Sequence, residues 1–218
     1  MDRVEKIAGR RRLLLCFDEY ERLEELPDES RTRILHFLRA TIQHRAQWIV
    51  LLSGARTFRE LKPYWSDYLI HVTPIRISFL DPADVDHLLR QPIPDFPNRY
   101  EPGVVEAILT ETNCHPYLVQ LTGQRLVEHL NSRRRQRITL ADLAAVFDLA
   151  IENDPFMHES WSRCNDDEQQ ALVTLARGSQ PPASPATESL RKRELIKIVN
   201  GHYQFVVPLF ARFVQHQT

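Results

Sequence analysis

The stretch LLLCFDE at residues 13–19 places five apolar residues directly before two carboxylates. An unbroken apolar run of this length predicts a buried parallel strand. Ligands of open α/β sheets bind at the carboxyl ends of the strands, so we expect Asp18 and Glu19 at a binding site. An aspartate there can hold Mg²⁺ through water, and a neighbouring glutamate can orient or deprotonate an attacking water. The alternative is a core strand followed by a solvated, acidic helix start.

A second apolar run, WIVLL at residues 48–52, ends in Ser53 and Gly54 and predicts another buried strand. Residues 30–45, between the two runs, repeat apolar side chains at helical spacing. Two strands joined by a helix predict a right-handed βαβ unit. We expect a third strand over residues 72–79, with its start at an edge or bend because of Pro74.

The sequence beyond residue 80 loses the strand pattern and becomes helical, which predicts a boundary there. A helix start at Asp81-Pro82 is followed by a proline-rich loop over residues 91–102 and by two more helices. Thr139 and Asp142 are spaced like a capping box, and a further helix opens after Asn165. The segment 178–187 is expected to be mobile. Asn200-Gly201 between two β-prone runs predicts a hairpin, and a last amphipathic helix spans residues 208–215.

The composition is that of an ordinary globular protein. Lys and Arg (28) nearly balance Asp and Glu (29), so overall charge favours neither nucleic acid nor membrane. Three widely spaced cysteines predict buried thiols in a reducing compartment, not disulfides or a zinc site. The charged N-terminus is unlike a signal peptide, and no apolar run approaches the roughly 20 residues that span a bilayer. We therefore expect a cytoplasmic protein.

Three motifs in this order resemble the AAA+/STAND class of P-loop ATPases, in particular the prokaryotic type with a helical lid and a C-terminal winged helix. Residues 13–19 resemble Walker B, residues 49–56 (IVLLSGAR) the sensor-1 strand, and residues 113–121 (NCHPYLVQL) the lid segment near the adenine. The resemblance implies an α/β fold, a partial P-loop ATPase sheet, followed by an all-α lid and a winged-helix domain. Residues 1–80 would be the C-terminal part of the nucleotide-binding core, 81–135 the lid and 139–218 the winged helix.

The resemblance also implies ATP and Mg²⁺ as cofactors and assigns roles to single residues. Asp18 would hold the metal and Glu19 the attacking water. Ser53 would contact the nucleotide or its water, and Arg56 the γ-phosphate. Each has an ordinary alternative: Ser53 a turn-capping hydroxyl, Arg56 a surface arginine. The last two expected contacts, lining the adenine pocket, are His115 and Pro116, although proline is also common at a helix start.

The sequence departs from the family in one decisive respect, because the phosphate-binding loop G-x-x-x-x-G-K-[ST] is absent. No Gly-Lys dipeptide occurs, and only twelve residues precede the first apolar run. That loop cradles the phosphates and ligates Mg²⁺, so both cofactors depend on a loop supplied from elsewhere. The family's central strand is missing too, which leaves strand edges without partners. We expect an upstream segment or a partner chain to complete the sheet.

Basic residues raise a nucleic-acid hypothesis. A winged helix reading DNA needs exposed cations, and the segment before the hairpin supplies Arg191, Lys192 and Arg193, although acidic residues weaken the field of this module. Arg133, Arg134 and Arg135 lie in a basic linker that either binds phosphate or is simply solvated. Two functions therefore remain: a module of an ATPase, and a non-enzymatic module that binds DNA or protein around a decayed nucleotide core.

Overall fold

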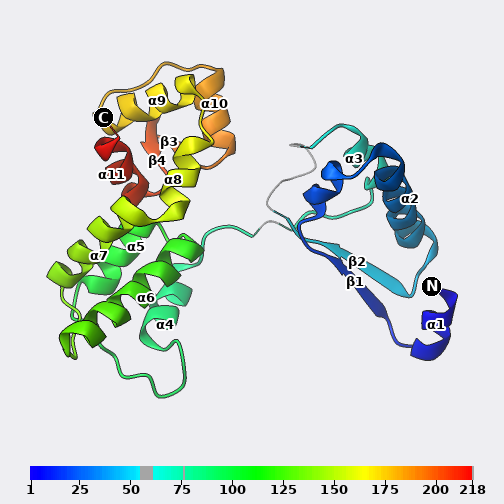
Figure 1. Cartoon of the computed structure of the whole chain (residues 1–218), viewed down its shortest axis with the longest axis horizontal. Coiled ribbons are helices and arrows are strands. Elements are labelled where there is room, and N and C mark those ends of the chain that lie inside the picture. Colours follow the sequence, from blue (N-terminus) through cyan, green and yellow to red (C-terminus); the bar gives the residue numbers. More distant parts are fainter. Residues whose placement is uncertain (55–60, 76, 218) are drawn as a thin grey trace. The chain divides into compact units, whose positions relative to one another are not determined.

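The computed structural model describes residues 1–54, 61–75 and 77–217. The chain divides into two compact units, unit 1 (Met1–Arg76) and unit 2 (Ile77–Thr218) (Figure 1). Arg56 lies outside the described residues. Across the described residues, no helix combines the length and the apolar character needed to cross a bilayer.

Unit 1 contains the predicted βαβ arrangement. Strand β1 (Leu13–Phe17) pairs in parallel with β2 (Trp48–Leu52), and helix α2 (Asp28–His44) connects them. Helix α1 (Asp2–Ala8), a 3₁₀ turn η1 (Tyr20–Glu25) and the short α3 (Tyr64–Tyr68) complete the unit. Side chains of α2, η1 and α3 form a small core, in which the Tyr20 and Trp65 rings meet edge to face at 5.4 Å.

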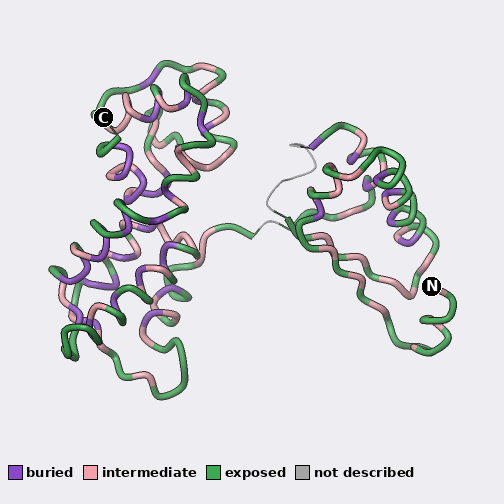
Figure 2. Tube along the Cα trace, viewed as in Figure 1, coloured by how far each residue is buried: buried purple, intermediate pink, exposed green. Residues whose placement is uncertain are grey.

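One face of the β1–β2 sheet is apolar and is not covered by the described residues of unit 1. Side chains alternate along both strands between half-buried and exposed, and the two strands contain no fully buried residue (Figure 2). The exposed positions are Leu14, Cys16, Ile49 and Leu51. Parallel sheets are normally covered on both faces, so this sheet displays a surface that its sequence is suited to bury.

The third strand expected over residues 72–79 is wrong for the residues that the structure describes there, because none of them pairs with another strand. In the described residues the sheet consists of β1 and β2 alone. It therefore offers no further strand with which residues 72–79 could pair. Strand geometry needs a hydrogen-bonded neighbour, and without one Ile75 and Ile77 are 81% and 92% exposed.

Unit 2 is helical apart from one hairpin. Helices α4 (Pro82–Arg90), α5 (Val104–Thr112), α6 (Pro116–Arg133) and α7 (Leu140–Asn153) form one half, and the long loop before α5 follows the predicted proline-rich stretch. The other half contains α8 (Pro155–Ser162), α9 (Asp166–Ala176), α10 (Pro185–Lys192), the antiparallel hairpin β3 (Ile196–Val199) and β4 (His202–Phe205), and α11 (Pro208–His216). The helix after Asn165, the hairpin at Asn200-Gly201 and the last helix are the predicted ones, whereas α8 and α10 were not predicted.

A single hydrophobic core runs through both halves of unit 2. Helix α11 packs against α5, α7 and α9 (Figure 1). Its Phe213 is fully buried. The core draws residues from both sides of the 135/139 division, so the proposed lid and C-terminal domain share one interior. Their separation into two domains stays a prediction.

Helix starts in unit 2 follow the sequence signals. The Thr139 hydroxyl accepts a hydrogen bond from the Asp142 backbone, and the Asp142 carboxylate accepts one from Thr139 N at 2.9 Å, which makes the predicted capping box. The same device, unrecognised in the sequence, opens α10 at Ser184 and Thr187. Part of the segment 178–187, which was expected to be mobile, is therefore helical, because α10 begins at Pro185.

Candidate functional site

The two strand ends of unit 1 bring Asp18 and Ser53 together. Each residue follows the last residue of its strand, and the parallel register pairs those last residues, Phe17 and Leu52. The Ser53 hydroxyl donates a hydrogen bond to Asp18 Oδ1 at 2.8 Å, and the Glu19 backbone N–H donates to the same oxygen at 3.0 Å. With Oδ1 held by two donors, the exposed carboxylate is oriented at the tip of the sheet.

Glu19 lies beside this pair but is directed differently. Its backbone is left-handed (φ 49°), which is uncommon for a non-glycine residue. Its carboxylate accepts a hydrogen bond from Arg22 Nη1 at 3.2 Å, with both side chains more than 60% exposed. An ion pair this exposed is weak, so the Glu19 carboxylate is free to move to another partner.

The turn at Tyr20 and Glu21 lies close against Ser53 and Gly54 at the end of β2. A Cβ atom at Gly54 would lie 2.0 Å from Glu21 Oε2 and 2.9 Å from the Tyr20 ring. Tyr20 N also donates to the Ser53 carbonyl at 3.1 Å. The turn after β1 therefore lies directly against the end of β2, and a larger residue at position 54 would displace the Glu21 carboxylate and the Tyr20 ring.

Of the two implied cofactors, Mg²⁺ and ATP, the side chains of Asp18 and Ser53 suit only Mg²⁺ without help from other residues. An exposed carboxylate with an adjacent hydroxyl suits a hydrated Mg²⁺, which is usually bound through one or two carboxylates and keeps several waters. A triphosphate needs a cradle of backbone N–H groups and a lysine, and the 218 residues contain no Gly-Lys. Among the described residues, no group of three or more His, Cys, Asp or Glu side chains is arranged to hold a metal by itself.

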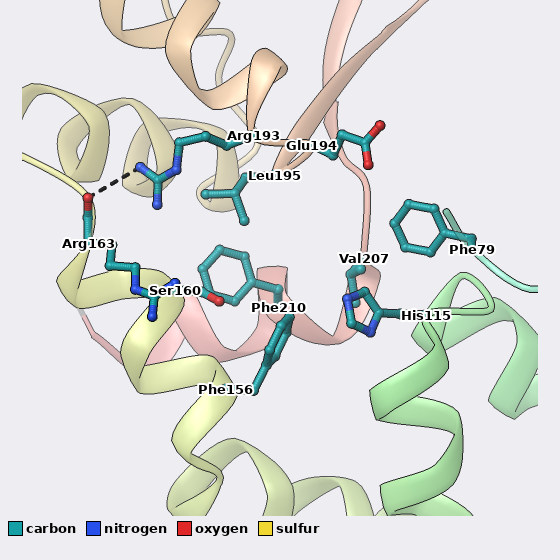
Figure 3. A pocket seen from close by; sticks show the side chains of 10 residues that line it. All are labelled: Phe79, His115, Phe156, Ser160, Arg163, Arg193, Glu194, Leu195, Val207 and Phe210. Carbon is teal, nitrogen blue, oxygen red and sulfur yellow. Dashed lines mark hydrogen bonds between the residues drawn. The ribbon is translucent and has the colours of Figure 1, made fainter. Parts of the chain in front are cut away.

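His115 lines a pocket of about 260 Å³ within unit 2 (Figure 3). The ring lies between two phenylalanines, with centroids 5.4 Å from Phe79 and 4.8 Å from Phe156. Leu195, Val207 and Phe210 extend the apolar wall, and the polar lining comes from Ser160, Arg163, Arg193 and Glu194. Pro116 occupies the first position of α6 directly after His115, as the sequence predicted.

The imidazole of His115 is kept neutral. Burial lowers the pKa of His115, and its Nδ1 atom is buried without a hydrogen-bond partner among the described residues. A buried acceptor without a partner costs less than a buried donor, which favours the proton on Nε2. The next residue but one, Tyr117, donates from its hydroxyl to Asp154 Oδ2 at 2.9 Å and so ties the start of α6 to the start of α8.

The predicted basic residues divide into neutralised and free side chains. Arg135 donates to the buried Asp142 at 2.7 Å, and Arg193 donates to the buried Glu168 at 3.1 Å, so both have structural roles. Arg191 pairs with Glu188 on the surface at 2.6 Å. In contrast, Arg133, Arg134 and Lys192 are exposed, with no ion pair within the described parts of the chain.

Most of the pocket around His115 was not predicted from the sequence. Phe79 was assigned to a strand, and Phe156 and Arg163 lie on or next to α8, a helix that the sequence pattern did not reveal. A signal was present, since Asp154-Pro155 is a helix start in which Asp154 caps Phe156 N at 2.9 Å. The convergence of these segments on His115 comes from tertiary packing and has no local sequence signature.

Comparison with known proteins finds similarity in structure but not in sequence. The sequence matches no protein-family model and no curated relative. Solved structures of P-loop ATPases do match, so the chain has the fold of part of such an ATPase.

Two solved ATPase structures show how far this likeness extends. The RuvB Holliday junction branch migration motor of Thermotoga maritima matches with a TM-score of 0.53 and 12% identity, over 94% of this chain and 70% of RuvB. The Walker-type ATPase PABY2304 of Pyrococcus abyssi matches with a TM-score of 0.58 and 16% identity, over 98% of this chain and 65% of that protein. The chain thus spans about two thirds of the length of these structures.

Proposed function

We propose that this chain is the Walker B, sensor, lid and winged-helix portion of an AAA+/STAND-like ATP-binding protein. In this role Asp18 holds hydrated Mg²⁺ and Glu19 orients the attacking water. His115 and Pro116 contribute to the adenine site, and Arg56 is a candidate for the γ-phosphate. Bound Mg²⁺ would neutralise charge on the phosphates. The nucleotide state would be relayed to the α9–α11 module, whose helix, helix, hairpin, helix order is that of a winged helix.

One observation carries this proposal: the Ser53 hydroxyl orients the Asp18 carboxylate at the joint tip of two parallel strands. Ligands bind at this edge in open α/β sheets, and this edge is the one at which P-loop ATPases hold the metal and the attacking water. The shared fold with P-loop ATPases supports the same assignment. Ser53 thereby acts on the metal through Asp18 rather than on the nucleotide alone.

The phosphate loop and the central strand are proposed to come from polypeptide other than residues 1–218. The uncovered face at Leu14 and Leu51 supports this, because an apolar parallel sheet is stable only when covered. An upstream segment of a longer product or a partner chain would supply the cover, the strand beside β2 and the phosphate cradle together. Covering this face would also bury the Cys16 thiol, which is exposed in residues 1–218.

Calorimetric titration with Mg-ATP tests the proposal. Residues 1–218 alone should bind at millimolar affinity or weaker, since the donors for the triphosphate are missing. The native assembly, isolated through a C-terminal tag, should contain a G-x-x-x-x-G-K-[ST] segment and bind in the micromolar range. Asp18→Asn should weaken that binding at least about tenfold in the presence of Mg²⁺ and change it little with EDTA. A native assembly that ignores Mg-ATP contradicts the proposal.

Thiol labelling tests the completion of the sheet separately. In a Cys114→Ser, Cys164→Ser background, Cys16 should react rapidly with a maleimide in residues 1–218. The same thiol should be protected in the native assembly. Equal reactivity in both would show that this face stays uncovered, even if ATP binding is found.

The missing Gly-Lys supports a second candidate, a non-enzymatic module that binds DNA or protein around a decayed nucleotide core. It predicts no response of the native assembly to nucleotide. If the partner is DNA, binding should weaken steeply with salt.

A further inference from the structure

The loop that joins α6 to α7 concentrates positive charge at one end of unit 2. Residues 132–137 contain four arginines and no acidic residue. Only Arg135 is neutralised, by Asp142. Arg133, Arg134 and Arg137 are exposed, and within the described residues their side chains form neither an ion pair nor a hydrogen bond. Three guanidinium groups are thus available in a chain whose net charge is −1.

The loop is held in place by hydrogen bonds on both sides. Arg135 N donates to Leu130 O at 3.0 Å, which closes the end of α6. Ile138 N donates to Arg99 O at 2.8 Å and Glu101 N donates to Ile138 O at 3.0 Å, a short parallel pairing with the loop that precedes α5. The buried Asp142 carboxylate also binds His129 Nε2 at 3.1 Å. Little conformational entropy is therefore lost when this loop binds a ligand.

A second pocket, of about 180 Å³, is lined by Arg135 and Gln136 of the same loop. Its apolar wall is formed by Phe96, Pro97, Tyr100 and Val127, and its polar rim by Arg99, Asn131, Arg135 and Gln136. The pocket is open to solvent, and its aromatic wall offers a face on which a planar ring can stack. The amides of Asn131 and Gln136 carry both donors and acceptors, as the edge of a nucleobase does.

We propose that this end of unit 2 binds single-stranded nucleic acid. Arg133, Arg134 and Arg137 contact consecutive phosphates, to which the guanidinium fork is matched, and one unstacked base enters the pocket against Phe96. A base slot favours a single strand over a duplex, in which the bases stay stacked. It also favours nucleic acid over an acidic peptide, which would satisfy the arginines and leave the pocket unused.

This site is distinct from the one expected on a winged helix. Two of the four cations on α10 and its neighbouring hairpin form ion pairs, Arg191 with Glu188 and Arg193 with Glu168. Lys192 and Lys197 remain exposed there, and neither of them lines the His115 pocket or the second pocket. Figure 1 places α10 and the α6–α7 loop at opposite ends of unit 2, so the two groups of cations do not form one track. The proposal does not depend on whether the chain binds ATP.

Fluorescence anisotropy of a labelled oligothymidylate with the full chain tests the proposal. The lid variant Arg133→Gln, Arg134→Gln, Arg137→Gln removes three exposed charges without touching the core. The matched control Arg191→Gln, Lys192→Gln, Lys197→Gln removes three charges near the hairpin. We expect the lid variant to bind at least about tenfold more weakly and to lower the slope of log K against log salt by about two units, since each phosphate contact contributes ~0.7. The control should bind within about threefold of the unmodified chain.

Two further probes address the pocket. Phe96→Ala, or an oligonucleotide of abasic residues, should weaken binding at least about fivefold while leaving the salt slope unchanged, because stacking is lost and charge is not. A duplex of the same sequence should bind more weakly than the single strand. The proposal is overturned if the chain does not bind the oligonucleotide, if the control variant loses binding while the lid variant keeps it, or if polyglutamate displaces the single strand at equal charge concentration.

Discussion

The two units of this chain bury their apolar side chains to very different degrees. Unit 2 encloses one continuous core, in which side chains such as Phe213 and Leu172 are wholly removed from solvent. Unit 1 has a small core on one side of its sheet and leaves the other side apolar and open. The difference teaches that unit 2 buries its apolar side chains within itself, whereas unit 1 keeps an apolar sheet face that its described residues do not bury.

The largest expected effect contrasts one side chain from each unit. Phe213→Ala should destabilise unit 2 by about 3–5 kcal/mol, because the ring is fully buried and leaves a cavity. Leu51→Ala, at a position 48% exposed on the open sheet face, should change stability by no more than ~0.5 kcal/mol. Urea unfolding followed by circular dichroism measures both. A comparable loss in Leu51→Ala would mean that the sheet face is already covered, for example by self-association.

Hydrogen exchange should show the same contrast along the backbone. Amides of β1 and β2 belong to a two-stranded sheet with two open edges, whereas those of α6 and α11 lie against the continuous core. We expect the slowest amides of unit 1 to exchange at least ~100-fold faster than the slowest of unit 2, since local opening free energies follow buried contact. Mass spectrometry of peptic fragments measures this. Equal protection would contradict the view that unit 1 is incomplete.

A moderate effect is expected where the sequence signal and the structure coincide. Thr139→Ala removes the hydroxyl of the capping box and should destabilise unit 2 by about 1 kcal/mol. Thr139→Ser keeps the hydroxyl and should restore most of the loss. Thermal unfolding of both variants provides the test, and a serine variant as unstable as alanine would assign the effect to packing of the methyl group instead.

The sequence predicted those parts of the fold that local chemistry determines. The apolar runs ending at Phe17 and Leu52, the capping box at Thr139 and the Asn200-Gly201 hairpin are each encoded within a few residues. The parallel pairing of these two strands aligns their ends and thereby brings Asp18 and Ser53 to one edge. The strand at 72–79 failed because a strand depends on a neighbour that these residues do not supply. The pocket at His115 and the pairing of Arg193 with Glu168 could not be predicted, since they join segments far apart in the sequence.

The smallest expected effect concerns the neutral imidazole in the His115 pocket. Burial lowers the pKa of His115, so between pH 6.5 and the folded-state pKa the unfolded chain binds more protons at this site than the folded chain does. Stability then rises with pH, and the contribution of His115 is complete above about pH 6.5 and is lost as the pH falls below it. His115→Gln removes this titration and leaves the other eight of the nine histidines unchanged.

The His115→Gln variant should therefore lose less stability than the unmodified chain when the pH falls from 7 to 5, in urea unfolding at each pH. His36→Gln is a suitable control, because that ring lies on exposed α2 of unit 1, against Tyr68 at 5.0 Å. It should leave the pH dependence of unit 2 unchanged. Parallel pH profiles for His115→Gln and the unmodified chain would show that a polar partner reaches the buried Nδ1 atom and keeps the charged form accessible. The pocket would then be wetter than its aromatic walls indicate.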